Sequence, residues 1–305
     1  MGNFHHRQRV VGRPGQALPI VALLLITGPE ATFSAEVTIV DERPVATMVE
    51  SLEKEFGVPI TYEDPPYLFA NDFADATANT ASPESVAKSK RVNVSLKARR
   101  LRFNNTAATT GGDLDALTQT IQNALTANNE DSPPGIFELS RTVGRFHVYP
   151  KNVKDKFGQY VPYTSLLDVP ISIEAQDRNG RDFISEFCAA VARASNSQFG
   201  PPPFGSWSYW RQQRTSLGAA GRTGREVLLQ FLDLLESRQS VPGARFSWSI
   251  LHPIAGEHPT LTIHLVRTRE GVVTKLPRQN APVANPPPQN TTRSDGASTP
   301  RRPMK

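Results

Sequence analysis

The sequence contains a single cysteine, Cys188, among its 305 residues, so it cannot form an internal disulfide. Stability must therefore come from a buried core. Cys188 lies in "FISEFCAAVARA", between Ile184 and Val191 on the apolar stripe of a predicted helix. This position indicates a buried, inert thiol rather than a nucleophile.

The chain also lacks a long hydrophobic run beyond its first 35 residues. The run that is present, "ALPIVALLLITG", has 12 residues, fewer than the roughly 20 of a transmembrane helix. Three arginines precede it, and small residues follow at Ser34 and Ala35. This arrangement predicts a secretory signal peptide over residues 1–35, cut after Ala35 or Ser34, and a periplasmic or extracellular mature chain that does not span a membrane. An uncleaved membrane anchor is the alternative.

The part of the chain that we expect to fold has no excess of basic residues. The formal net charge is +5, but residues 268–305 hold seven basic and two acidic side chains, and residues 1–35 hold three and one. Residues 36–267 therefore carry a net charge of −2, which does not indicate nucleic-acid binding. The last 38 residues are rich in Pro, Asn, Thr, Ser and Arg, so we expect a disordered basic tail over residues 268–305.

Helix and strand patterns divide the rest into two similar halves. In the first half, Pro44 suits a helix start, Gly57 suits its end, and five apolar residues fall on one face: Val45, Met48, Val49, Leu52 and Phe56. The strands "VTIV" and "PITYED" flank this helix. "RVNVSLKA" alternates, with Val92, Val94, Leu96 and Ala98 on the expected buried face. A second helix has Leu114, Leu117, Ile121 and Leu125 on its apolar face, and "GIFELSRTVGRFHVYP" predicts two strands joined near Gly144.

The second half follows the same order. "VPISI" is a predicted strand, residues 182–195 and 224–237 are predicted helices, "SQFG" and "RTSL" are short strands, and "RFSWSILHP" with "TLTIHLVRT" form a closing pair. Thr223 and Glu226 have capping-box spacing at the start of the last helix. We expect an α+β fold of two tandem β-α-β-β-α-β-β modules, at residues 36–150 and 166–267, with a linker over 151–165.

Each half resembles the short N-terminal domain of secretins and TonB-dependent receptors, the STN domain. The resembling segments are "RPVATMVESLEKEFGVPITYE", "VNVSLKA", "LDALTQTIQNAL" and "FHVYP" in the first half, and "RTSLGAAGRTGREVLLQFLDLLE", "FSWSILHP" and "LTIHLV" in the second. The resemblance implies a periplasmic domain with two helices packed between small sheets that contacts other proteins. No segment after the modules has the strands of an outer-membrane barrel, which that family's receptors carry.

Several histidine and acidic residues could bind a metal ion by residue type, but their spacing matches no known metal-binding motif. His147 and His264 occupy matching places in the closing strands, and we interpret them, with His252 and His258, as polar residues on exposed strand faces rather than metal ligands. Four acids, Glu63, Asp64, Asp72 and Asp75, lack calcium-loop spacing, and we interpret them as a solvated loop.

Known catalytic patterns are absent from the sequence. It contains no His-Glu-x-x-His, Gly-x-Ser-x-Gly, paired Cys-x-x-Cys or phosphate loop. Ser-x-x-Lys occurs twice, at Ser51 with Lys54 and at Ser85 with Lys88, but without the companion motifs of acyl enzymes. We expect a non-enzymatic scaffold or interaction protein of the bacterial cell envelope that needs no cofactor. An envelope hydrolase acting on cell-wall material is the alternative.

Two segments are candidates for contact with a partner. The first is a basic strand face with Lys97, Arg99, Arg100 and Arg102, which suits an anionic glycan, a lipid headgroup or an acidic protein, or is merely solvated. The second is the Pro- and Gly-rich segment "FGPPPFGSWSYWR", whose aromatic residues either anchor an envelope protein or fold back onto the second core. Its aromatic residues are Phe199, Phe204, Trp207, Tyr209 and Trp210.

Replacing Trp207, Tyr209 and Trp210 together with Ala is expected to weaken capture of an envelope partner by more than about 2 kcal/mol, the usual scale for anchor residues. Pull-down from envelope extract measures capture, and circular dichroism measures folding. Loss of folding together with capture would assign these aromatics to the core, and unchanged capture would place the partner elsewhere.

Overall fold

The structure is a computed structural model. It describes residues 35–75, 94–108, 113–142, 144–201, 209–238, 245–254 and 258–267, and backbone only for Tyr209 and Trp210. Of the predictions above, the signal segment, Ser85, Lys88, Phe204, Trp207 and the tail lie outside these residues. Within them, no helix is long and apolar enough to cross a membrane.

Both halves of the chain contain helices and strands, so the α+β prediction is confirmed. The elements of the first half are β1 (Ala35–Asp41), α1 (Pro44–Phe56), β2 (Ile60–Glu63), η1 (Ala70–Asp72), β3 (Phe73–Asp75), β4 (Val94–Leu96), β5 (Arg99–Asn105), α4 (Leu114–Glu130), β6 (Gly135–Thr142), β7 (Arg145–Lys154) and β8 (Tyr160–Pro162). Those of the second half are η2 (Leu166–Asp168), β9 (Pro170–Ile173), β10 (Arg178–Asn179), α5 (Gly180–Ser195), η3 (Tyr209–Gln212), β11 (Arg214–Thr215), β12 (Ala219–Thr223), α6 (Gly224–Ser237), β13 (Arg245–Leu251) and β14 (Thr260–Val266).

Local sequence signals account for the helix ends. Helix α1 begins at Pro44, and Gly57 ends it in the left-handed conformation, at a φ of 65°. Helix α6 starts with the predicted capping box, in which Thr223 and Glu226 satisfy each other's backbone donors. Gly144, at a φ of 74°, permits the hairpin between β6 and β7.

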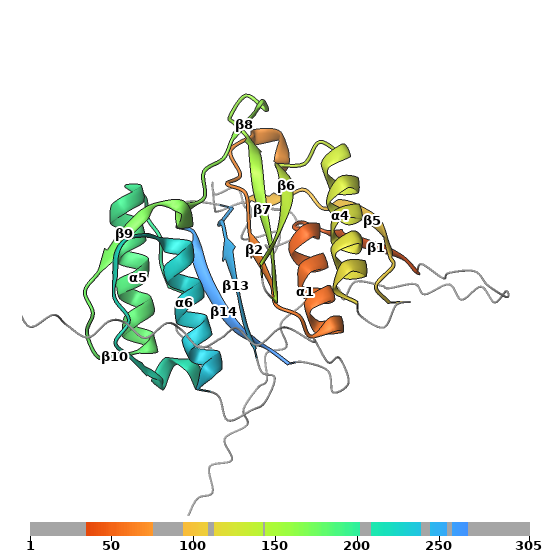
Figure 1. Cartoon of the computed structure of the whole chain (residues 1–305). Coiled ribbons are helices and arrows are strands. Elements are labelled where there is room, and N and C mark those ends of the chain that lie inside the picture. The colour runs from red at the N-terminus through yellow and green to blue at the C-terminus, as the bar shows by residue number, and fades with distance from the viewer. Residues whose placement is uncertain are drawn as a thin grey trace, which may run out of the picture. The chain divides into compact units, whose positions relative to one another are not determined.

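One six-stranded sheet contains strands from both halves, in the order β14-β13-β2-β7-β6, with β8 also paired to β7 (Figure 1). Strand β13 of the second half runs parallel to β2 of the first, with Ser249 opposite Tyr62 and Ile250 opposite Glu63. The expected linker over residues 151–165 is not an open connection, because it includes the end of β7 and all of β8.

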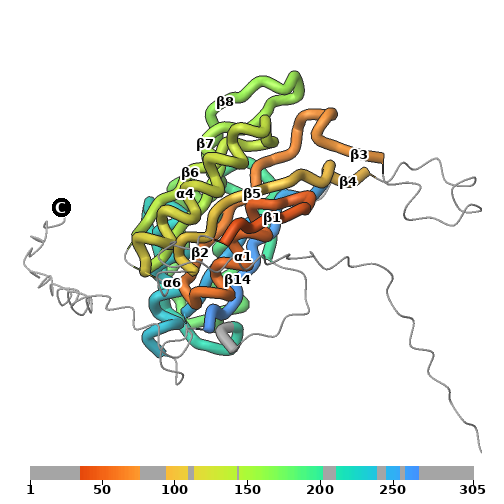
Figure 2. The backbone as a smooth tube through the Cα atoms, turned by 90° about the vertical axis from the view of Figure 1, so that its right-hand side faces the viewer, coloured from red at the N-terminus to blue at the C-terminus, as the bar shows by residue number. Residues whose placement is uncertain are grey.

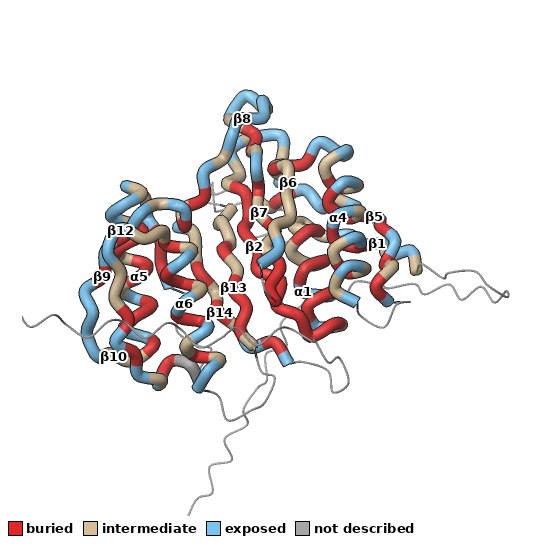
Figure 3. Tube along the Cα trace, in the orientation of Figure 1, coloured by how far each residue is buried: buried red, intermediate tan, exposed pale blue. Residues whose placement is uncertain are grey.

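The two helix pairs cover opposite faces of this sheet. Successive strand residues point to opposite faces, and residues paired in register share a face. Tyr62 packs in the core under α1 and α4, whereas Trp248 and Ile250 pack in the core under α5 and α6. Figure 1 shows the sheet between the two helix pairs, and Figure 3 shows that its inner strands are largely buried.

Each helix pair is covered on its outer side by a two-stranded ladder. Strands β1 and β5 pair antiparallel over all seven residues of each, from Ala35 with Asn105 to Asp41 with Arg99. Strands β9 and β12 pair antiparallel in the second half, with an irregularity between Ala220 and Arg222. Figure 2 shows β1 and β5 side by side on the α1 and α4 side.

The strand predicted over "RVNVSLKA" is described only from Val94, where β4 buries Leu96 as predicted, but the expected burial of Val94 is wrong. The described strand in that region, β4, is only three residues long and pairs with β3, and Val94 is 42% exposed. The long strand of this region is β5, which begins at Arg99 and buries Leu101 and Phe103. Only two of its inward residues, Leu101 and Phe103, are apolar and the buried Asn105 follows them, so the apolar alternation is too short to indicate a strand.

Charged residues join the halves where β2 ends. Glu63 is 1% exposed, with Nη1 of Arg225 of α6 at 2.7 Å and Nε2 of His147 at 3.1 Å from its Oε1. Asp64 is fully buried on the other face, where Nε of Arg43 lies 2.9 Å from Oδ2. The interpretation of Glu63 and Asp64 as solvated loop residues is therefore wrong.

The Asp64 side chain is satisfied by several donors besides Arg43. The hydroxyls of Tyr62 and Tyr67 donate to Oδ1 at 2.8 and 2.6 Å, and the backbone N–H of His252, from the second half, donates to Oδ2 at 3.3 Å. Arg43 also donates to the His252 carbonyl at 2.6 Å. These bonds tie the loop after β13 to the end of β2.

A third set of contacts joins the halves near the hairpin between β6 and β7. Nη2 of Arg145, at the start of β7, lies 2.6 Å from Glu236 and 3.0 Å from Asp233, both on α6. Arg145 also donates to the Phe246 carbonyl, and Arg245 donates to the Gly144 carbonyl at 2.5 Å. The halves therefore share hydrogen bonds at both ends of the β13–β2 contact.

Burial raises the pKa of Glu63, but the hydrogen bond from His147 and the charge of Arg225 outweigh it and hold the pKa at about 2. A depressed carboxyl pKa stabilises the fold above its unfolded value, near 4.5, and this stabilisation is lost as pH falls towards 2. The shift corresponds to about 3 kcal/mol.

The variant Glu63→Gln is therefore expected to lower the free energy of unfolding at pH 7 by about 3 kcal/mol, because Arg225 loses its buried partner. The difference in unfolding free energy between wild type and Glu63→Gln should become smaller as the pH falls from 4.5 to 2. Urea unfolding followed by circular dichroism checks both. Asp177→Asn, which breaks an ion pair exposed on both sides, is the control and should leave the midpoint nearly unchanged. Equal effects of the two variants would contradict a special role for Glu63.

Candidate functional site

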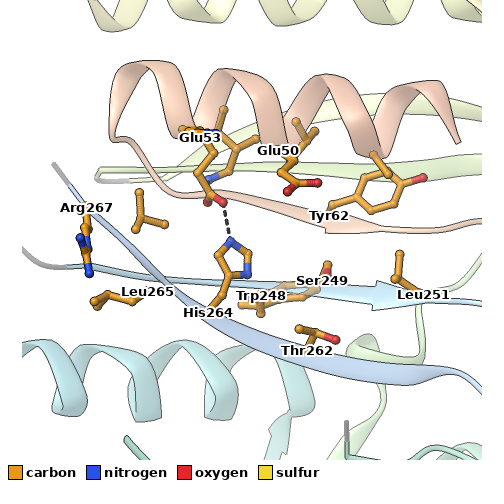
Figure 4. A pocket seen from close by; sticks show the side chains of 15 residues that line it. Glu50, Glu53, Tyr62, Trp248, Ser249, Leu251, Thr262, His264, Leu265 and Arg267 are labelled. Atoms are coloured by element: carbon orange, nitrogen blue, oxygen red, sulfur yellow. Dashed lines mark hydrogen bonds and ion pairs between the residues drawn. The ribbon is translucent and has the colours of Figure 1, made fainter. Parts of the chain in front are cut away.

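The helix arrangement leaves part of the central sheet uncovered beside α1. Helices α5 and α6 cover one face of β13 and β14, whereas α1 and α4 cover the opposite face of β2, β7 and β6. On the sheet face that α1 covers, β13 and β14 extend beyond the helix and are left uncovered. Helix α1 and these uncovered strands border a cavity of about 600 Å³, which we call the α1 groove (Figure 4).

The α1 groove is lined mainly by apolar side chains, with charged groups along its helix side. Its fifteen lining residues come from α1, β2, β13 and β14 and from Arg267, which follows β14: Ala46, Val49, Glu50, Glu53, Lys54, Ile60, Tyr62, Trp248, Ser249, Leu251, Thr262, His264, Leu265, Val266 and Arg267. A concave apolar surface with a few placed polar groups is the usual form of a binding site.

A carboxylate and an imidazole meet inside the groove. Nε2 of His264 contacts Oε2 of Glu53, whose other oxygen accepts the Ile60 backbone N–H at 2.9 Å (Figure 4). The Glu53 side chain is 6% exposed and that of His264 is 42% exposed. The backbone bond fixes Glu53, so the carboxylate holds the His264 ring across the groove.

Burial lowers the pKa of His264, but the hydrogen bond and charge of Glu53, with the charge of Glu50, outweigh burial and raise the pKa above its ordinary value. Glu50 is exposed at the middle of the groove and forms no ion pair with another described residue. The groove therefore contains one acid that is already paired and one that is open to a basic ligand.

Among the described residues, the His264 ring is hydrogen-bonded to Glu53 and to no serine or threonine hydroxyl, although Ser249 and Thr262 also line the groove. A Ser-His-acid mechanism needs a hydroxyl that both the imidazole and a substrate can reach. Ser247 is the cross-strand neighbour of His264, but it is 0% exposed and does not line the groove. Within the described part of the chain, no three or more His, Cys, Asp or Glu side chains gather as a metal site.

The histidines differ from their predicted setting. The His147 side chain is 13% exposed, in contact with Glu63, and its ring lies 5.1 Å from those of Tyr149 and Trp248. Burial lowers the pKa of His252 to about 4. The interpretation of His147 and His252 as exposed strand residues is wrong, because the joined sheet encloses both.

The four residues of the predicted basic strand face do not all point to solvent. Arg100 and Arg102 are exposed on β5, opposite Val40 and Thr38 of β1, and Lys97 is exposed just before it. The Arg99 side chain is 16% exposed and pairs with Asp131 at 3.2 Å. Three of the four predicted cations therefore face outward.

The aromatic segment is described in part. Phe199 is 6% exposed and belongs to the core under α5 and α6, so folding back onto the core is correct for this residue. Gly200 forms an isolated bridge with Thr260 of β14. Cys188 is 1% exposed, as predicted, and burial raises the pKa of its thiol.

A second cavity of about 500 Å³ lies near the start of α5 and is lined by polar residues, including Asp177, Arg178 and Asp182. Asp177 already pairs with Arg214 at 2.6 Å, with both side chains more than 60% exposed. The cavity is a solvated surface depression, and the α1 groove remains the better candidate.

Comparison with known proteins adds no family to this description. No protein-family model, no curated protein and no solved structure matches the chain. The functional argument therefore depends on the residues and their geometry.

The raised pKa of His264 predicts a measurable change on removing its partner. The stabilising contact with Glu53 is fully present below the ordinary histidine pKa and is lost as pH rises through the raised value. Glu53→Gln should lower the His264 pKa, measured by NMR titration of the ring protons. His147, which contacts Glu63 and not Glu53, serves as the internal reference. An unchanged His264 pKa would show that Glu53 does not set it.

Proposed function

We propose that this chain is an exported, non-enzymatic interaction protein of the bacterial cell envelope, which binds a partner protein through two STN-like modules joined edge to edge. The observation that carries the proposal is the α1 groove, a largely apolar cavity at the joint of the two halves. Its occupant on this proposal is an extended or helical segment of the partner.

The repeated strand pairing supports the module part of the proposal. In each half, the first strand pairs antiparallel with the strand before the second helix, β1 with β5 and β9 with β12. In each half a closing antiparallel pair follows, β6 with β7 and β13 with β14. The chain order of these pairings is the order that the resemblance implies. Superposition of residues 36–150 on 166–267 remains the direct test.

Export is proposed from the N-terminal sequence, where three arginines, a 12-residue apolar run and small residues occur in signal-peptide order. The exposed cations Lys97, Arg100 and Arg102 are a separate surface that suits an anionic glycan or lipid headgroup. The hydrolase alternative is less well supported, because no serine or threonine hydroxyl among the described residues is hydrogen-bonded to His264.

A bulky charge in the groove should block partner binding. Thr262 is half-buried on β14 and lines the groove, so Thr262→Arg fills it without removing a core side chain. We expect capture of a partner from envelope extract to fall at least tenfold. Thr142→Arg, at an exposed end of β6, is the matched control and should capture normally.

Circular dichroism and the urea midpoint establish that both variants fold. If Thr262→Arg and Thr142→Arg capture the same proteins in equal amounts, the groove is not the partner site. Hydrolysis of cell-wall material by the wild type, abolished in His264→Ala, would favour the hydrolase instead.

A further inference from the structure

A hairpin with an exposed aromatic residue at its end projects from the central sheet. It joins β7 to β8, and in Figures 1 and 2 it extends past the neighbouring strands. Phe157, at its end, is 71% exposed, the largest fraction for any large apolar side chain among the described residues. The ammonium nitrogen of Lys156 lies 4.9 Å from the centre of the Phe157 ring. We call these two residues the hairpin tip.

The backbone of the hairpin tip is held in one conformation. Oδ1 of Asp155 accepts the backbone N–H groups of Phe157 at 2.8 Å and of Gln159 at 2.9 Å. Gly158 has a φ of 82°, and a Cβ there would lie 2.8 Å from the Phe69 ring, so only glycine fits. An aromatic side chain on a rigid backbone loses little conformational entropy when it is bound. The hairpin tip therefore has the properties of an interface anchor.

Contacts at the base of the hairpin fix its direction. Lys154 is buried, donates to the Ser132 carbonyl at 2.7 Å and lies 3.4 Å from Oδ1 of Asp72. The Tyr160 hydroxyl donates to the Pro133 carbonyl at 2.6 Å. The hairpin is therefore tied to the loops on both sides of it, and its tip is presented in a fixed direction.

The hairpin tip lies far from the α1 groove of its own chain. Val148 of β7 pairs with Tyr62, which lines the groove. Beyond Val148 the strand continues through residues 149–154, about 20 Å at about 3.3 Å per residue, and the tip follows this strand. The tip and the groove are separate surfaces of one molecule, so a contact between them requires two copies.

We propose that the hairpin tip of one copy docks in the α1 groove of a second copy, with Phe157 on the apolar lining and Lys156 beside Glu50. The inference rests on the proposed function, because it takes the groove as a protein-binding site. It names the occupant, an extended hairpin of this same protein.

The size and lining of the groove suit this occupant. Its volume of about 600 Å³ lies within the range of about 300 to 1,000 Å³ that is typical of binding cavities. Leu265 on its wall is 43% exposed, so both surfaces present an apolar side chain that the described fold leaves uncovered. Docking the tip would remove both of these side chains from water.

The charges favour a protein groove over a lipid surface. Glu53 is engaged by His264 and by the Ile60 backbone, whereas Glu50 forms no ion pair with another described residue and can accept the Lys156 ammonium group. Asp155 adjoins Lys156, so the end of the hairpin has no net charge. Binding to anionic lipid depends on a cluster of cations, which this surface lacks.

A contact between two different surfaces of one chain has a consequence for assembly. It is heterologous, so each copy still presents a free hairpin tip or a free groove after it has bound one neighbour. Copies therefore add head to tail and form a ring or a chain. Such an assembly suits a scaffold.

Mixing two variants tests this arrangement directly. Phe157→Asp removes the hairpin tip and keeps the groove, whereas Thr262→Arg blocks the groove and keeps the tip. By light scattering, the wild type should assemble as its concentration rises, and each variant alone should remain monomeric. An equal mixture should form a dimer of one copy of each, because one intact tip and one intact groove remain. Val40→Asp, at an apolar residue of β1 that is 55% exposed, is the matched control and should assemble normally.

A charge exchange tests the orientation. Glu50→Lys and Lys156→Glu should each weaken assembly, and the double variant should assemble at least tenfold more tightly than either. Circular dichroism establishes that all variants fold. A wild type that stays monomeric at every concentration, assembly by Phe157→Asp alone, or a mixture that forms no dimer would overturn the proposal. Binding to phosphatidylglycerol vesicles that Phe157→Asp abolishes, with no dimer in the mixture, would assign the tip to lipid instead.

Capture from envelope extract of cells that lack this chain separates the inference from the proposed function. If Thr262→Arg loses a captured protein while the wild type stays monomeric, the groove binds another partner and the assembly proposal is wrong. If the mixed dimer forms while Thr262→Arg captures the same proteins as Thr142→Arg in equal amounts, the assembly proposal is correct and no separate partner uses the groove.

Discussion

The short parallel contact between β2 and β13 is the interaction on which the remaining structure depends. It joins the β13-β14 pair to the unit β2-β7-β6, in which β8 also pairs with β7, and so forms one six-stranded sheet. Its register contains only two residue pairs, followed by a hydrogen bond from the Asp64 N–H to the Ile250 carbonyl at 2.9 Å. So short a ladder needs further contacts between the halves. The ion pairs of Glu63 and Arg145 and the hydrogen bond from the His252 N–H to Asp64 supply them.

This contact also determines where the groove lies. Since Tyr62 and Ser249 share one face, and Glu63 and Ile250 the other, each half can place its helices on a different face of the common sheet. Helix α1 then borders the uncovered part of β13 and β14, and the α1 groove is the space that remains. The candidate site is thus a consequence of strand register and helix placement, and neither half would form it alone.

Local features were predictable from the sequence and long-range ones were not. The ends of α1, the capping box of α6 and the buried position of Cys188 follow from residues that are close in the chain. Strand β5 was not predicted because only two of its inward residues, Leu101 and Phe103, are apolar, while the buried Asn105 is polar. The groove was missed for a different reason: Glu53 and His264 are 211 residues apart, so no local pattern connects them. One signal was present, since Glu53 adjoins the apolar stripe of α1 between Val49 and Phe56, where an acid needs a buried partner.

Buried charges are an unusual choice for joining two halves, because desolvation offsets much of their attraction and apolar residues often stabilise as well. The advantage of these buried charges is that they select the register between β2 and β13. A slip of one residue between β2 and β13 would turn every side chain of one strand to the opposite face. Glu63 would then lose Arg225 and Asp64 would lose the His252 N–H, the two partners that come from the second half. Two consecutive acids with partners on opposite faces therefore exclude the neighbouring registers, and they thereby fix the position of β14 opposite α1 that creates the groove.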